Sequence, residues 1–79
     1  MNAVIIDNLR YMRAMFGKTQ KDFSSVMGLS PQAYSNIENG KRKVSAEELW
    51  RIATHLNVDI AIFFNEKLTE SVIKELQAI

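Results

Sequence analysis

The fold of this chain is decided by residues 20–39, Q-K-D-F-S-S-V-M-G-L-S-P-Q-A-Y-S-N-I-E-N. Phe23 and Met27 are four residues apart, so they share one face of a first helix. Tyr34 and Ile37 are three residues apart and share one face of a second helix. The stretch therefore predicts two short helices, each with one apolar face.

The turn between these helices is Gly28-Leu29-Ser30. Gly28 can take the positive φ that a sharp exit from a helix requires. Ser30 is a good N-cap, and Pro31 at the first helical position loses no hydrogen bond. This is the pattern of a helix-turn-helix motif. In that motif the second helix, here about residues 31–39, lies in the major groove of DNA while the first helix crosses the backbone.

The remaining sequence also predicts helices and no strands. An apolar stripe predicts a helix over about residues 4–16, which Gly17 can end. A capping box of Ser45 and Glu48 begins a fourth helix, and Asn57 suits its left-handed stop. Asp59 can cap a short fifth helix over residues 60–64. The sequence thus predicts an all-α fold.

The composition indicates one small globular domain. The 79 residues are 47% apolar and 24% charged and include no cysteine, which excludes disulfides and thiolate metal sites. Such a chain buries only about 60–65% of its unfolded surface, so oligomerisation would help its stability. The single histidine, His55, has no second ligand near it in the sequence, so we expect no metal site and no cofactor.

No sequence pattern indicates an enzyme or a membrane protein. The chain lacks a phosphate-binding glycine loop and a nucleophile with a matched base. The apolar run at residues 3–6 is broken by Asp7 and has no basic segment before it, so it does not predict a signal peptide. No run approaches the roughly 18 apolar residues of a membrane span. We therefore expect a cytoplasmic protein without catalytic activity.

The charges are distributed unevenly although the formal net charge is only +1. Residues 10–43 contain seven basic and two acidic residues, a net charge of +5, and the rest of the chain sums to −4. A basic half that can face phosphate is typical of a nucleic-acid-binding module. Small domains also show such asymmetry by chance, so it serves only as support for the motif.

A family resemblance follows from the apolar positions, the turn glycine and the segment after the second motif helix. These residues are Thr19, Gln20, Phe23, Met27, Gly28, Leu29, Tyr34, Ile37, Glu38, Asn39, Gly40, Lys41 and Arg42. The sequence resembles the Cro and phage-repressor type of helix-turn-helix protein, the XRE family. The resemblance covers about sixty residues and implies a lambda-repressor-like DNA-binding domain of five helices, residues 1–64. Residues 65–79 form a C-terminal extension that the resemblance does not cover.

Two residues depart from the family pattern. Ser24 stands where the family usually has alanine, and its hydroxyl is expected to bond back to a carbonyl one turn earlier. Pro31 stands where relatives often have a polar base reader, and it can offer only apolar contact, for instance to a thymine methyl.

Three further residues of the second motif helix are candidate base readers. The Gln32 amide can pair with N6 and N7 of adenine, and Asn36, one turn later on the same face, can do the same. Ser35 can reach a base or a phosphate. The alternative is that these exposed side chains are only solvated.

Other residues are expected to hold the DNA backbone. The resemblance implies phosphate contacts at Gln20 and in the loop that contains Asn39, Lys41, Arg42 and Lys43. The alternative for the loop is a solvated basic segment. The resemblance also pairs Glu38 with Arg13 in a structural salt bridge, since an isolated carboxylate would repel phosphate.

The last third of the chain carries more apolar residues than we expect one small core to hide. Residues 69–79 predict a short amphipathic helix, which is unstable alone and must dock on its own domain or on a second subunit. A two-fold dimer would present two recognition helices to a palindromic site. The residues expected in its interface are Ile62, Phe63, Phe64, Leu76 and Ile79.

Together, the motif and the resemblance predict a homodimeric, sequence-specific regulator that binds double-stranded DNA, most simply a repressor or autoregulator. The alternative is an antitoxin-type module that masks a partner protein with its apolar C-terminal surface and binds its own promoter.

Overall fold

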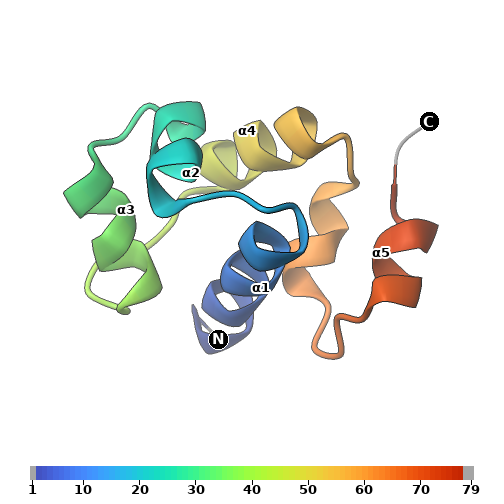
Figure 1. Cartoon of the computed structure of the whole chain (residues 1–79). Coiled ribbons are helices and arrows are strands. Elements are labelled where there is room, and N and C mark those ends of the chain that lie inside the picture. The colour runs from blue at the N-terminus through green and yellow to red at the C-terminus, as the bar shows by residue number, and fades with distance from the viewer. Residues whose placement is uncertain (1, 78–79) are drawn as a thin grey trace.

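The computed structural model describes residues 2–77, whose regular elements are helices joined by short loops (Figure 1). The elements are α1 (Asn2–Met15), α2 (Gln20–Met27), α3 (Pro31–Glu38), α4 (Ala46–Leu56), the 3-10 helix η1 (Ile60–Phe64) and α5 (Glu70–Glu75). Within residues 2–77 the only β-type pairing is an isolated antiparallel bridge between Val58 and Gln77. The all-α fold class predicted from the sequence is confirmed. No helix of this part of the chain is long and apolar enough to cross a membrane.

The helix ends lie close to the positions that the capping residues predict. Ser30 accepts a hydrogen bond from the Ala33 N–H at the start of α3, and Ser45 forms its capping box with Glu48 at the start of α4. Gly28 ends α2 with φ 76°, and Asn57 ends α4 with φ 57°. Both residues occupy the left-handed region, where an ordinary side chain costs free energy.

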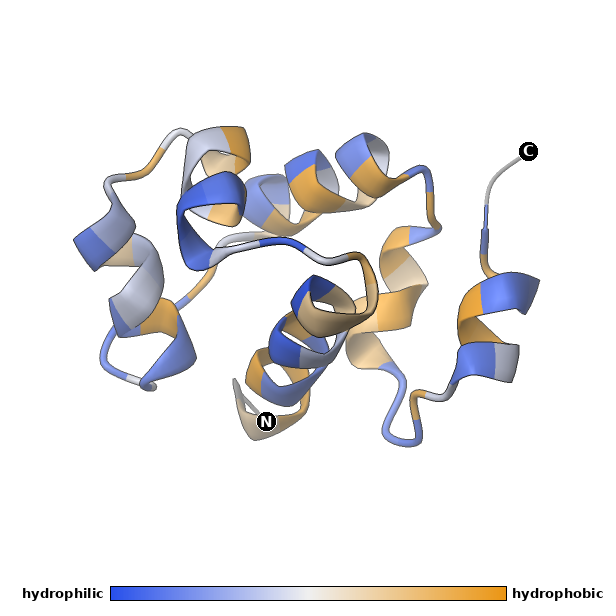
Figure 2. Ribbon diagram, viewed as in Figure 1, coloured by the Kyte–Doolittle hydropathy of each residue, from blue (hydrophilic) through white to orange (hydrophobic). Residues whose placement is uncertain are grey.

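The core lies between the helices and is built from the apolar faces that the sequence spacing predicted. Figure 2 shows this most clearly for α4, whose hydrophobic side is turned toward the middle of the molecule. Phe23 of α2 and Tyr34 of α3 are fully buried, and their rings meet edge to face with centroids 5.9 Å apart. Ser24 of α2 is buried, and its hydroxyl donates to the Lys21 carbonyl at 2.8 Å. The predicted bond to the preceding turn thus accommodates this departure from the family pattern.

A buried polar residue, Asn8, joins α1 to η1. Its Nδ2 donates to three backbone carbonyls, those of Ile62 at 3.3 Å, Phe63 at 3.0 Å and Asn65 at 2.8 Å. These carbonyls lie at the C-terminal end of η1, where helical donors run out, and among them the Ile62 carbonyl also accepts from the Asn65 N–H at 3.4 Å. Asn8 therefore fixes the C-terminal end of η1 against α1, a role that the sequence did not reveal.

The structure corrects two of the residues expected in a dimer interface. Ile62 and Phe63 are fully buried within the chain's own core, so neither side chain is available to a second subunit. The physical reason is that η1 packs against both α1 and α4, so two successive side chains that point in different directions both meet the core. Phe64, the next residue, points outward and is 55% exposed.

The C-terminal segment docks on its own domain. Ile73 of α5 is part of the core, and Leu76 is half-buried against it. The Asp59 N–H donates to the Leu76 carbonyl at 2.7 Å, next to the bridge between Val58 and Gln77. This pairing ends α5 at Glu75, so the helix is shorter than the predicted range of residues 69–79. Ile79, the last residue expected in the interface, lies outside the described residues.

Candidate nucleic-acid interface

The recognition helix is α3, which lies at the opposite end of the molecule from α5 (Figure 1). Tyr34, Ile37 and Glu38 of α3 are buried against the rest of the domain. On its other side, Pro31 and Gln32 are exposed, and Ser35 and Asn36 are partly exposed. The four residues predicted to read bases thus form one accessible strip along α3. Gln32 Nε2 donates to Asn36 Oδ1 at 3.1 Å within this strip.

The inner side of α3 is held by a buried carboxylate. Glu38 is 3% exposed and accepts hydrogen bonds from Arg13 Nε at 2.8 Å and Arg13 Nη2 at 3.2 Å. It also accepts from the Tyr34 hydroxyl at 2.6 Å and from Gln20 Nε2 at 2.9 Å. We call these four residues the Glu38 cluster. The cluster connects α1, α2 and α3, so it fixes the angle at which the recognition helix leaves the domain.

The protonation states of the Glu38 cluster follow from its contacts. Burial alone would raise the pKa of Glu38, but the hydrogen bonds from Arg13, Tyr34 and Gln20 outweigh burial and hold this pKa below its ordinary value. The hydrogen bond to Glu38 raises the pKa of Arg13. Burial and the nearby carboxylate raise the pKa of Tyr34, which therefore stays a neutral donor. At neutral pH Arg13 and Glu38 therefore form an ion pair. Among the described residues, every buried side-chain nitrogen and oxygen atom has a hydrogen-bond partner.

Gln20 has a partner inside the protein. One of its side-chain N–H groups donates to Glu38 at 2.9 Å, and the phosphate contact that the family resemblance implied for this residue stays a prediction. Thr19 caps the same helix end and forms a reciprocal capping box with Asp22. Gln20 in this structure therefore acts as a positioning residue for α3.

The loop after α3 is wrapped closely around the end of that helix. The N–H groups of Lys41 and Arg42 both donate to the Asn36 carbonyl, at 2.8 and 3.1 Å, and Gly40 takes φ 77° to allow the turn. Asn39 is exposed as the C-cap of α3, and Lys41 and Lys43 are exposed beyond it. These three side chains are accessible, and their contacts with the DNA backbone remain a prediction.

Arg42 of the same loop has a carboxylate partner. Its Nη1 and Nη2 donate to the two carboxylate oxygens of Glu48, at 3.2 and 3.1 Å. The hydrogen bond to Glu48 raises the pKa of Arg42. A guanidinium held in this fork is matched to a carboxylate and ties the loop to the start of α4. Arg42, which was expected to contact phosphate, is thus engaged by the protein itself.

Two arginines support the motif without having been predicted as site residues. Arg10 Nη2 donates to the Glu38 carbonyl, and its side chain remains half exposed beside the end of α3. Arg51 Nη1 donates to the Met27 carbonyl at 3.4 Å and so lies over the turn at Gly28. Arg10 stands one helical turn before Arg13 in the sequence. This spacing puts both residues on the same face of α1, so it could have predicted that Arg10 also lies near Glu38. The contact of Arg51 depends on packing between α2 and α4 and has no local signal.

Comparisons with known proteins place this interface in a family. No curated protein and no solved structure shows a significant match to the chain. A family model described as helix-turn-helix matches residues 9–63, which include the whole of α2, α3 and α4. The chain belongs to this helix-turn-helix family of Cro- and phage-repressor-type proteins, and it is a DNA-binding transcription regulator.

Proposed function

We propose that the protein regulates transcription by binding a palindromic operator as a homodimer, with α3 of each subunit in the major groove. The observation that carries this proposal is the division of α3 into two sides. The inner side is fixed by the Glu38 cluster, and on the outer side Pro31 and Gln32 are exposed and Ser35 and Asn36 are partly exposed. A rigid helix with a polar outer side is what direct readout in the major groove requires.

The charges around α3 support the same orientation. Lys41 and Lys43 are exposed cations beyond its C-terminal end, and Arg10 contributes a half-exposed guanidinium beside it. The Glu38 carboxylate is neutralised by Arg13, so it does not oppose a phosphate. In this proposal Lys41, Lys43 and Asn39 contact the backbone, while Gln20 and Arg42 position the groups that do.

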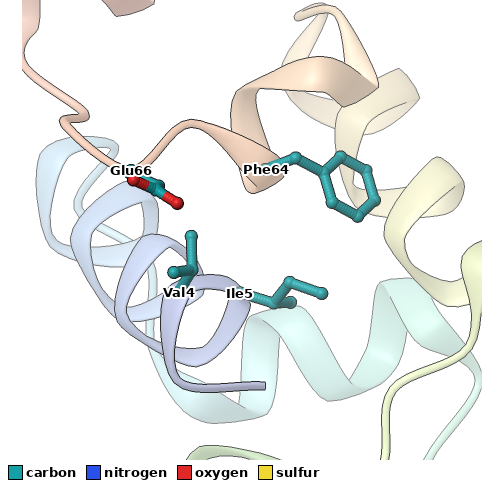
Figure 3. A pocket seen from close by; sticks show the side chains of 4 residues that line it. All are labelled: Val4, Ile5, Phe64 and Glu66. Carbon is teal, nitrogen blue, oxygen red and sulfur yellow. The ribbon is translucent and has the colours of Figure 1, made fainter. Parts of the chain in front are cut away.

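In this proposal a second copy of the chain occupies a groove beside the N-terminal end of α1. Val4 and Ile5 of α1 face Phe64 and Glu66 across a hollow of about 400 Å³ (Figure 3). Phe64 borders the hollow and is 55% exposed, so the same face carries both a protruding ring and an apolar recess. A face that offers both can be self-complementary about a two-fold axis, with each Phe64 reaching the recess of the partner.

Operator geometry sets the separation that the two copies of α3 need in this dimer. Half-sites on DNA lie about 34–36 Å apart when they are separated by one helical turn, and the domain itself measures 31 Å in its longest dimension. In this proposal the two-fold contact holds the two copies of α3 at that separation, in successive major grooves. The proposed interface consists of Phe64 with Val4 and Ile5, in place of the buried Ile62 and Phe63.

Selection of bound DNA from a random pool tests the binding function. The selected sequences should converge on an inverted repeat whose half-site centres are about 10 to 10.5 base pairs apart. Equal affinity of the purified protein for the selected and the unselected pool would refute sequence-specific regulation by this chain.

Sedimentation equilibrium of Phe64→Ala tests the dimer. Burying a Phe side chain contributes about 1.5–3 kcal/mol, and a two-fold interface counts the change twice, so dimerisation should weaken by roughly 3 kcal/mol or more. Trp50→Ala is the matched control, because Trp50 is 58% exposed on α4 and lies outside the groove. A wild-type protein that stays monomeric at high micromolar concentration would remove the homodimer and favour a partner protein in the groove.

A further inference from the structure

Gln32 and Asn36 are bonded to each other before any DNA is present. They are one turn apart on α3, and the angle between them around the helix axis is only about 40° at 100° per residue. Gln32 Nε2 donates to Asn36 Oδ1 at 3.1 Å. Both side chains lie on the accessible side of the recognition helix. Two amides that both point into a major groove therefore start with one of their hydrogen-bonding positions already used.

The mutual bond makes the two amides chemically different. A free side-chain amide offers two N–H donors and an oxygen with two lone pairs. After the bond, Gln32 keeps one N–H and its whole oxygen, so it offers one donor next to one acceptor. Asn36 keeps both N–H groups but has only one lone pair left, so it is mainly a donor.

These two patterns match different bases. Adenine presents N7 as an acceptor and N6 as a donor in the major groove, which complements the pattern of Gln32. Guanine presents N7 and O6, and thymine presents O4, all of them acceptors, which complements the donors of Asn36. Cytosine presents only the N4 donor at its polar edge and matches neither residue well.

We propose that Gln32 and Asn36 form one coupled reading unit, in which Gln32 selects adenine and Asn36 selects a keto base, guanine or thymine. The inference rests on the proposed DNA-binding function. It replaces the simpler expectation that each amide independently pairs with an adenine. The mutual bond also holds both side chains in one arrangement, so less rotamer freedom remains to be lost on binding.

Coupling has a consequence that independent reading lacks. Without the Asn36 side chain, Gln32 regains its second donor and its rotational freedom, and its preference for adenine should fall. Two independent readers would instead give effects that add in free energy. A double-mutant cycle on defined DNA sites separates the two cases.

The cycle uses the full chain with Gln32→Ala, Asn36→Ala and the double variant, measured by fluorescence anisotropy on the selected half-site and on sites with single base-pair changes. Gln32→Ala should abolish the adenine preference at one base pair. Asn36→Ala should abolish the keto preference at a neighbouring base pair and also lower the adenine preference of Gln32 about three- to tenfold. The loss of affinity in the double variant should be at least threefold smaller than the product of the two single losses.

Lys43→Ala is the matched control, because this exposed residue is not bonded to Gln32. When Lys43→Ala is combined with Gln32→Ala, the loss of DNA affinity should equal the product of the two single losses within about twofold. Additivity of the same size for Gln32 and Asn36 would overturn the coupled unit. Selection of adenine at both positions would overturn the assignment of donors and acceptors.

A measurement on the free protein separates failure of this inference from failure of the proposed function. The Gln32 side-chain NH2 signals in a nitrogen-15 spectrum should shift when Asn36 is replaced by alanine. Unchanged signals would overturn the bonded pair, independently of the result of the DNA-binding measurements. A protein that shows the shift but binds no DNA selectively would refute the proposed function, and the inference that rests on it would fall with it.

Discussion

Replacing Glu38 by alanine should destabilise the domain by about 3–5 kcal/mol. The substitution removes the carboxylate that accepts four hydrogen bonds from Arg13, Tyr34 and Gln20. It leaves the Tyr34 hydroxyl without its acceptor in a fully buried position and leaves the Arg13 side chain, 24% exposed, without its counter-charge. Breaking a buried ion pair by removing one partner typically costs about 3–5 kcal/mol.

This cost is large for a chain of this size. At roughly 0.05–0.15 kcal/mol per residue, 79 residues give a free energy of unfolding of about 4–12 kcal/mol. The variant should therefore lose a quarter or more of its stability, and DNA binding should fall with it because α3 is no longer fixed. The Tyr34 bond alone accounts for about 1.5–3 kcal/mol of the total, since hydrogen bonds to charged groups are worth that much.

Urea denaturation followed by circular dichroism at pH 7 measures the difference by linear extrapolation. Glu47→Ala is the matched control, because Glu47 also pairs with an arginine, Arg51, but the two side chains are 71% and 44% exposed. Exposed pairs contribute about 0–1 kcal/mol, so the control should stay close to wild type. If Glu38→Ala costs no more than Glu47→Ala, the argument that the Glu38 cluster holds α3 in place is wrong.

The same carboxylate makes stability depend on pH in a defined direction. The pKa of Glu38 in the folded protein lies below its ordinary value of 4.5, so the folded state binds fewer protons there than the unfolded state. The contribution of the carboxylate is therefore complete above about pH 4.5 and is lost as the pH falls through the lowered pKa. Glu38→Gln should accordingly lose less stability than wild type between pH 7 and pH 3. An equal loss would show that other carboxyl groups dominate the acid response.

Four further single substitutions test the turn, the η1 junction and the loop after α3. Gly28→Ala should cost about 1–2 kcal/mol, and thermal denaturation will show it, because φ is +76° and the new Cβ would stand 3.0 Å from Arg51 Nη1; an unchanged melting temperature would contradict this strain. Asn8→Ala should cost about 1–3 kcal/mol in urea denaturation, because it removes the donor for three backbone carbonyls, and a loss under 0.5 kcal/mol would mean that water replaces the amide. Lys41→Ala and Lys43→Ala should each weaken binding to all DNA sequences alike and lower the slope of log K against log salt by up to about one per subunit, whereas an unchanged slope in the double variant would remove both lysines from the backbone contacts.

The helices themselves could be predicted from the sequence because their signals are local. Apolar residues three and four apart select the inward face of each helix, and the caps at Ser30, Ser45 and Asn57 act on groups within one turn. The turn at Gly28 has a local signal too, because its positive φ favours glycine at that position. The accessible strip of α3 follows from the same periodicity, since the residues between its apolar positions must face outward. The base-reading roles of that strip remain predictions.

The tertiary structure alone decided which polar groups meet. Gln20 and Glu38 are 18 residues apart, and Asn8 and Asn65 are 57 apart, so no local pattern could pair them. Within the run Ile60–Phe64 every residue is apolar, and the sequence therefore could not tell which side chains enter the core. Only the packing of η1 against α1 turns Ile62 and Phe63 inward and leaves Phe64 exposed. Local spacing fixes the helices, whereas partners and exposed faces depend on how those helices pack, because packing brings together residues that are distant in the chain.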